Sequence, residues 1–242
     1  MKRLMDILGA LIGLTLGSPV LLPVMFAVWL QDRHSPFYVA PRVGKGDVLF
    51  RMVKLRSMVV NADKSGVDST GAADKRITAV GRFIRRYKLD ELTQLWNVLI
   101  GDMSLVGPRP NVKRETDLYT DAERKLLSVR PGITDFASIV FSDEGDILAD
   151  KRDPDLAYNQ LIRPWKSRLG ILYVERRSLW LDIKLCFYTL VAIADRPAAL
   201  KRVGRELVAL RAPSDLVRAS SRVDPLVPLP PPGATEVVVS RG

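Results

Sequence analysis

Residues 89–110 read LDELTQLWNVLIGDMSLVGPRP, and they place an acidic pair directly before an apolar helical pattern. The pattern predicts an amphipathic helix that ends near Gly101. Its apolar face consists of Leu92, Leu95, Trp96 and Leu99. Asp90 and Glu91 then lie at or near the helix N-terminus, where an isolated acidic pair most often serves only as a cap.

The same stretch ends in a loop in which Arg109 stands between Pro108 and Pro110. Proline fixes its own backbone angle, so the two prolines hold this loop rigid. A guanidinium group held in a rigid loop is suited to bidentate binding of phosphate. The alternative for the loop taken alone is an ordinary surface arginine.

Composition restricts the chemistry that 242 residues can perform. Lys and Arg exceed Asp and Glu to give a net charge of +10, which favours an anionic partner such as phosphate, nucleic acid or a membrane surface. The single cysteine and single histidine exclude an intramolecular disulfide framework and Cys/His zinc sites. P-loop and dinucleotide-binding glycine patterns are absent. A catalytic acid, base or metal ligand is therefore expected to be a carboxylate.

The N-terminal segment is uncharged from Ile7 to Leu30 and long enough, at about 1.5 Å per residue, to cross a hydrocarbon layer of about 30 Å. Ser18-Pro19 interrupts it, and basic residues flank both of its ends. Both flanks favour the cytoplasmic face, and the Ser18 hydroxyl can satisfy backbone groups freed by Pro19. From the residues alone, a kinked spanning helix and a re-entrant helix are equally open.

The rest of the chain reads as a small β-hairpin over residues 37–54, a polar loop at 61–75 that can close over a ligand, and amphipathic helices. The acidic stretch 143–155 is interpreted as solvated. Residues 180–194 predict a helix on the core or at the bilayer interface. These patterns divide the chain into a membrane segment (1–32), a catalytic domain (33–211) and a disordered proline-rich tail (212–242).

A membrane segment, several cations and an acidic pair are together compatible with phosphate chemistry at a bilayer surface. A carboxylate can attack phosphorus directly, which divides one displacement into two. Mg²⁺ prefers one or two carboxylates together with substrate phosphate oxygens, so Asp90 and Glu91 are the predicted metal ligands.

These motifs resemble the bacterial sugar transferases, the monotopic polyprenyl-phosphate phosphoglycosyl transferases. The similarity covers roughly residues 1–195 in the right order. It rests on residues 89–110 and on supporting matches at residues 54–58, 130–134, 173–175 and 178–184. The resemblance favours Ser18-Pro19 as the break of a re-entrant helix. The expected fold class is α+β and mostly helical, with a re-entrant membrane helix, a small β-hairpin and interfacial amphipathic helices around a compact catalytic core.

The resemblance implies that the chain transfers a sugar-1-phosphate from a UDP-sugar to polyprenyl (undecaprenyl) phosphate and releases UMP. Such a reaction initiates lipid-linked glycans such as exopolysaccharide, O-antigen, capsule or glycoprotein glycan. Asp90 carries over as the nucleophile and Glu91 as its partner, with Mg²⁺ as cofactor. The implied phosphate- or substrate-binding residues are Lys54, Arg56, Arg85, Arg109 and Asp182.

The implied location is the cytoplasmic face of the bacterial inner membrane, with membrane lipids as partners, no nucleic acid, and a homodimer possible. Relatives commonly follow Pro-Gly-Ile-Thr with a Gln-Val-x-Gly-Arg stretch. Residues 135–144 of this chain differ from it, which leaves the sugar open. Two alternatives stay open as well. One is a membrane-anchored basic binding module without catalysis, and the other is a glycosyltransferase that releases UDP.

Overall fold

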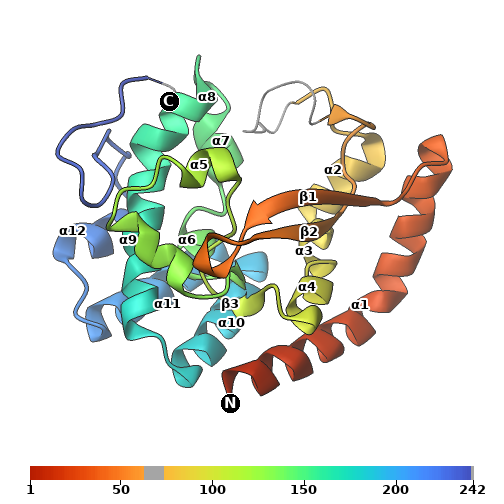
Figure 1. Cartoon of the computed structure of the whole chain (residues 1–242), viewed down its shortest axis with the longest axis horizontal. Coiled ribbons are helices and arrows are strands. Elements are labelled where there is room, and N and C mark those ends of the chain that lie inside the picture. The colour runs from red at the N-terminus through yellow and green to blue at the C-terminus, as the bar shows by residue number, and fades with distance from the viewer. Residues whose placement is uncertain (63–73, 241–242) are drawn as a thin grey trace.

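The computed structural model describes residues 1–62 and 74–240, so most of the predicted loop at 61–75 lies outside the described residues. The chain begins with one long helix, α1 (Lys2–Asp32), which runs along one edge of the molecule and bends in its middle (Figure 1). By length and composition alone, α1 is apolar enough to cross a membrane. The remaining elements form an α+β body that is mostly helical, as the sequence predicts.

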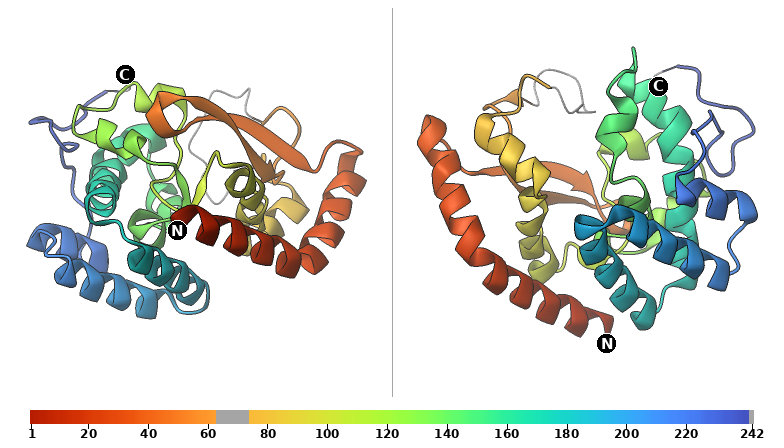
Figure 2. Two further views of the ribbon diagram at one scale, coloured as in Figure 1. Left: turned by 60° about the horizontal axis from the view of Figure 1, so that its bottom comes forward. Right: turned by 180° about the vertical axis from the view of Figure 1, so that it is seen from behind.

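The break in α1 has the chemistry that its sequence predicts. Pro19 has no N–H group to donate to the carbonyl of Thr15 four residues earlier. The Ser18 hydroxyl donates to that same carbonyl at 2.8 Å, so the oxygen freed by Pro19 is satisfied. The helix therefore continues through the proline while bending, and Figure 2 shows the bend from two further sides.

Both ends of α1 bind the same body. At its start, the Lys2 ammonium donates to the Asp182 carboxylate at 2.7 Å. At its end, Arg56 donates two hydrogen bonds to the Asp32 carboxylate, at 2.5 and 2.7 Å. Asp182 and Arg56 are both buried, whereas their partners Lys2 and Asp32 each keep about a third of the side chain exposed. A helix held in this way at both ends lies along the body instead of projecting from it.

The outer face of α1 is apolar and exposed. Its inner face packs through Ala10, Leu21 and Val28. These are buried against α2 (Ala79–Arg86), α4 (Leu95–Ile100) and β2 (Leu49–Leu55). The exposed large apolar side chains are Leu4, Leu8, Leu11, Ile12, Leu16, Val20, Leu22, Phe26, Trp29 and Leu30. An apolar face of this extent marks a membrane or protein contact.

After α1 the chain forms the predicted hairpin from β1 (Phe37–Val43) and β2 (Leu49–Leu55), which pair antiparallel. The helices α2 (Ala79–Arg86), α3 (Leu89–Leu92) and α4 (Leu95–Ile100) follow. The expected single helix after Asp90 is thus two short ones, and Gly101 ends the second with φ 100°. Trp96, expected on the buried face, is exposed instead because Val98 takes its place in the core.

A short parallel pair, β3 (Ser104–Val106) and β4 (Gly132–Thr134), fixes the proline-flanked loop. The Gly107 N–H donates to the Thr134 carbonyl at 2.9 Å, and the Gly132 N–H donates to the Pro108 carbonyl at 2.9 Å. A Cβ atom on Gly132 would stand 2.0 Å from the Gly107 nitrogen, and one on Gly107 would stand 2.5 Å from a carbonyl oxygen. Both positions therefore require glycine.

The C-terminal part packs the main core around α6 (Phe136–Val140), α9 (Arg163–Arg176), α10 (Leu179–Ala194) and α11 (Arg196–Ala209). Four shorter α-helices, two short 3-10 helices (η1 and η3) and one π-helical segment (η4) complete the described part of the chain. These are η1 (Lys45–Asp47), α5 (Lys113–Thr116), η3 (Glu123–Ser128), α7 (Glu144–Leu148), α8 (Pro154–Ala157), η4 (Tyr158–Ile162) and α12 (Ser214–Ser221). The helix predicted at 180–194 is confirmed by α10.

The tail differs from the prediction of disorder over residues 212–242. Residues 214–221 form α12, whose Leu216 is buried in the main core. The proline-rich part then docks on η4: the Leu229 N–H donates to the Gln160 carbonyl at 3.0 Å, and the Gln160 side chain donates to the Val238 carbonyl at 2.7 Å. The prediction is wrong because apolar side chains and backbone carbonyls of the tail find partners on the body.

Candidate active site

The acidic pair is positioned by the docking of α3 and α4 on the hairpin. The buried Asn97 side chain accepts from the Val53 N–H at 2.9 Å and donates to the Arg51 carbonyl at 2.7 Å, so it pairs with β2 as a neighbouring strand would. Thr93 adds a hydrogen bond to the Val53 carbonyl at 3.3 Å. This docking places Asp90 of α3 beside Lys54 of β2, with 3.9 Å between the carboxylate and the ammonium.

The Asp90 carboxylate is mostly buried and accepts no hydrogen bond from the residues that the structure describes. Burial raises the pKa of Asp90 above its ordinary value, and the neighbouring Glu91 raises it further, while Lys54, Arg109 and Arg85 oppose the rise. A carboxylate without donors, held among cations that stabilise its charged form, retains its lone pairs for a reaction or for a metal ion.

Glu91 lies in a different environment from Asp90, although it is the next residue. It accepts a hydrogen bond at 3.0 Å from the Arg109 guanidinium. Burial raises the pKa of Glu91, but Arg109, Lys88 and Lys54 outweigh it and hold the pKa below its ordinary value. The same ion pair raises the pKa of Arg109, so both groups are charged. The structure therefore brings the acidic pair and the proline-flanked arginine into one cluster.

Lys54 and Arg85 add two further cations to this cluster. Burial lowers the pKa of Lys54 to about 8, and the charge of Arg109 lowers it as well, against the opposing effect of Asp90. Arg85 uses its Nε–H to donate to the Ser57 hydroxyl at 2.9 Å. Within the described parts of the chain its two terminal nitrogens have no hydrogen-bond partner, so this guanidinium can receive an anion.

Two of the predicted phosphate- or substrate-binding residues lie outside the cluster. Arg56 binds Asp32, and Asp182 accepts from Lys2 and from the Tyr173 hydroxyl at 2.6 Å. Both charged groups are buried and already satisfied by partners from α1 or α9. In the structure they anchor the two ends of α1, and substrate binding by these two residues stays a prediction.

The predicted Mg²⁺ ligands, Asp90 and Glu91, have carboxylate oxygens that are free to bind the ion. No cluster of three or more His, Cys, Asp or Glu side chains occurs among residues 1–62 and 74–240. The chain therefore offers no all-protein cage there, but Asp90 has free oxygens and Glu91 has one oxygen that Arg109 does not use. Mg²⁺ commonly takes one or two carboxylates together with substrate phosphates, so this donor set suits it.

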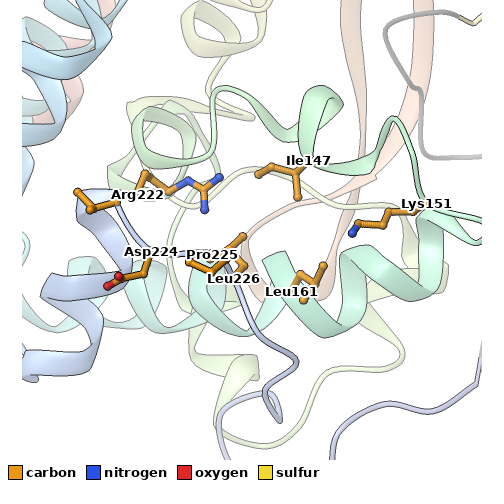
Figure 3. Close-up of a pocket in the computed structure, with 8 residues that line it drawn as sticks. Ile147, Lys151, Leu161, Arg222, Asp224, Pro225 and Leu226 are labelled. Carbon is orange, nitrogen blue, oxygen red and sulfur yellow. The ribbon is translucent and has the colours of Figure 1, made fainter.

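A separate surface groove of about 480 Å³ lies between α7, η4 and the start of the tail (Figure 3). Ile147, Leu161 and Leu226 give it apolar walls, and Lys151 and Arg222 stand at its sides. None of the sequence-predicted site residues lines it. The groove is therefore not the place where the acidic pair acts.

Comparison with known proteins identifies the family of the chain. The family described as "Bacterial sugar transferase" matches residues 1–196, which include α1, the hairpin and the whole acidic cluster. The chain belongs to the bacterial sugar transferase family.

Several relatives carry more specific names. The chain is 37% identical over 196 residues to a UDP-N-acetylgalactosamine-undecaprenyl-phosphate N-acetylgalactosaminephosphotransferase of Aeromonas hydrophila, covering 79% of this chain and 43% of the relative. It is 35% identical over 214 residues to a UDP-galactose-lipid carrier transferase of Erwinia amylovora, covering 82% and 41%. It is 32% identical over 197 residues to a UDP-glucose:undecaprenyl-phosphate glucose-1-phosphate transferase of Caulobacter vibrioides, covering 79% and 69%. The chain thus spans less than half the length of the first two.

Proposed function

We propose that the chain transfers a sugar-1-phosphate from a UDP-sugar to undecaprenyl phosphate, releases UMP and so begins the assembly of a lipid-linked glycan. The observation that carries this proposal is the Asp90 carboxylate, which has no hydrogen-bond donor among the described residues and lies 3.9 Å from the Lys54 ammonium, beside the Glu91–Arg109 ion pair. Membership in the family and the names of the relatives support the substrate class.

The reaction is proposed as two displacements at one phosphorus atom. A carboxylate oxygen of Asp90 attacks the β-phosphorus of the UDP-sugar, and the bond from that phosphorus to the oxygen bridging it to the α-phosphate breaks. UMP leaves with this oxygen, and the phospho-sugar stays on Asp90 as an acyl phosphate. A phosphate oxygen of the lipid then attacks the same phosphorus and releases the Asp90 carboxylate.

The cations of the site have distinct tasks in this scheme. Arg109 and Lys54 stabilise the negative charge that develops on the phosphoryl oxygens, and Arg85 offers a free pair of donors to the departing phosphate. Asp90 and Glu91 would hold Mg²⁺, which supplies positive charge to the phosphate oxygens when it is bound. Glu91 is kept ionised by Arg109 and so remains able to hold the metal.

The test is to incubate detergent-solubilised protein with undecaprenyl phosphate, Mg²⁺ and a panel of UDP-sugars, and to identify the nucleotide product. UMP release that depends on the lipid and stops on chelation of Mg²⁺ is expected. UDP release would instead identify a glycosyltransferase that moves the sugar alone. Binding of anionic lipid with no nucleotide released from any donor would support the noncatalytic binding module.

The pH profile is expected to report on Lys54. Because the pKa of this ammonium is about 8, it is charged at pH 7 and loses its charge as the pH rises. The value of kcat/KM for UMP release should therefore fall on the alkaline side with a midpoint near 8. In Lys54→Arg the side chain stays charged, and the alkaline limb should move to higher pH. An alkaline limb that does not move in this variant would assign the titration to another group.

The membrane arrangement is proposed to be re-entrant, with both ends of α1 on the cytoplasmic face. A spanning helix would separate its ends across the bilayer, whereas Lys2 and Asp32 bind the same body through Asp182 and Arg56. A charged residue held in the apolar layer is costly, so the body does not cross it.

Cysteine labelling tests this arrangement in a Cys186→Ala background. Single cysteines placed after Met1 and at Ser35 should both react from the cytoplasmic side in oriented membrane vesicles. Replacing Ser18 and Pro19 by alanine and leucine removes the break and should lower the cytoplasmic labelling of the first cysteine. A wild-type chain in which the first cysteine reacts only from the opposite side would contradict the re-entrant arrangement.

A further inference from the structure

Glu144 forms a second charged group near the reaction site, in a stretch that the sequence predicts to be merely solvated. It is the first residue of α7, and its carboxylate pairs with the Lys166 ammonium of α9. Lys166 also lies over the ring of Tyr158 in η4, 5.3 Å from its centroid. The Glu144 side chain is thus held by a second element and still keeps 35% of its surface exposed.

The chain topology places the start of α7, and with it Glu144, on the same side of the β3–β4 pair as Arg109 of the acidic cluster. The strands β3 and β4 are parallel, so their carboxyl ends meet at one edge. Arg109 follows β3, and α6 and then α7 follow β4. The electrostatics agree: Glu144 raises the pKa of Arg109, and Lys166, Arg109 and Lys54 together hold the pKa of Glu144 below its ordinary value despite burial. Arg109 therefore has a carboxylate partner in Glu91 and a second acidic neighbour in Glu144.

The chemistry of Glu144 differs from that of the phosphate-binding cations. A carboxylate repels phosphate, and Lys166 is already neutralised by its partner, so this pair does not serve the diphosphate. An ionised carboxylate can only accept hydrogen bonds. Lys166 uses only part of the accepting capacity of the Glu144 carboxylate, which therefore still has free lone pairs. In a sugar nucleotide, the groups next to the diphosphate that can donate two hydrogen bonds to one carboxylate are the vicinal hydroxyls of a sugar ring.

We propose that Glu144, oriented by Lys166, accepts hydrogen bonds from a pair of vicinal hydroxyl groups of the sugar nucleotide and so contributes to recognition of the donor. This inference rests on the proposed function, because it takes a UDP-sugar as the ligand. Two rings of that donor carry such hydroxyls, the transferred sugar and the ribose.

The test compares Glu144→Gln with wild type in donor binding and in UMP release, with UDP-glucose, UDP-galactose and UDP-N-acetylgalactosamine as probes. The amide loses the charge-assisted acceptor, so the dissociation constant and KM for the bound donor should rise about tenfold while kcat changes less than threefold. Glu144→Asp keeps the charge and should recover part of the affinity. Glu175→Gln is the matched control, because Glu175 is also a lysine-paired glutamate but pairs with the exposed Lys125.

Binding of UMP identifies which ring is recognised. If Glu144 contacts the transferred sugar, Glu144→Gln leaves the dissociation constant of UMP unchanged. If it contacts the ribose, UMP affinity falls by the same factor as donor affinity, and wild type but not the variant prefers UMP to 2′-deoxy-UMP. Unchanged binding of both donor and UMP in a folded Glu144→Gln variant overturns the inference. Calorimetry in an Asp90→Asn background measures donor binding without formation of the adduct. A chain that binds donors there but releases no UMP as wild type would contradict the proposed function and not this inference.

Discussion

Replacing Asp90 by asparagine is expected to reduce UMP release by about 10⁴-fold or more, close to the background. The amide has the shape of the carboxylate but not its charge, so it does not attack phosphorus. The variant should still fold, because the Asp90 carboxylate accepts no hydrogen bond from the described residues and its nearest cation stands 3.9 Å away. Steady-state UMP release with undecaprenyl phosphate present measures the effect.

The control for this variant is Asp121→Asn, which changes an exposed aspartate of the same chain outside the cluster. It should leave UMP release unchanged. Donor binding to Asp90→Asn should also persist, because Arg109, Lys54 and Arg85 remain in place. A variant that retains more than about a tenth of the wild-type rate would show that the lipid phosphate attacks the donor directly.

Replacing Arg109 by methionine is expected to lower kcat for UMP release by about 10²- to 10³-fold. The change removes the cation that holds Glu91 at 3.0 Å and that stabilises charge on the transferred phosphoryl group. Arg109→Lys should recover only part of the rate, because a lysine ammonium cannot form the paired hydrogen bonds of a guanidinium.

The matched control is Arg124→Met, an exposed arginine on η3. Its UMP release should equal that of wild type, which separates the role of Arg109 from a general loss of positive charge. If Arg109→Met lost less than about fivefold in kcat, Arg109 would act only in the local structure of the acidic pair and would not stabilise the transition state.

The sequence predicts the elements whose signals are local. The apolar stretch with Ser18-Pro19 predicts α1 and its break, and short apolar runs on both sides of a glycine-containing turn predict the hairpin. The pair β3 and β4 has no comparable signal, because each strand has three residues and its partner lies far away in the chain. The identity of Asp90 as a site residue came from the resemblance, since an isolated acidic pair is more often a cap.

The sequence cannot predict ion pairs whose partners are distant in the chain. Arg56 and Asp182 occur in matching motifs, but their ion pairs with Asp32 and Lys2 join segments that no local pattern connects. Glu144 was missed for the same reason, because a run of acidic residues does not show that Lys166 faces one of them. Local composition likewise predicted a disordered tail, although the docking of residues 214–240 depends on the surface of η4 and α9.

The most direct test of the proposed mechanism is a rapid-mixing measurement of UMP release with a UDP-sugar and Mg²⁺ but without the lipid. If Asp90 is the nucleophile, a burst of one UMP per enzyme should precede any turnover. The mass of the peptide that contains Asp90 should then increase by that of one phospho-sugar. Adding undecaprenyl phosphate should remove the adduct. UMP that appears only after the lipid is added, with no adduct on Asp90, would contradict the covalent mechanism.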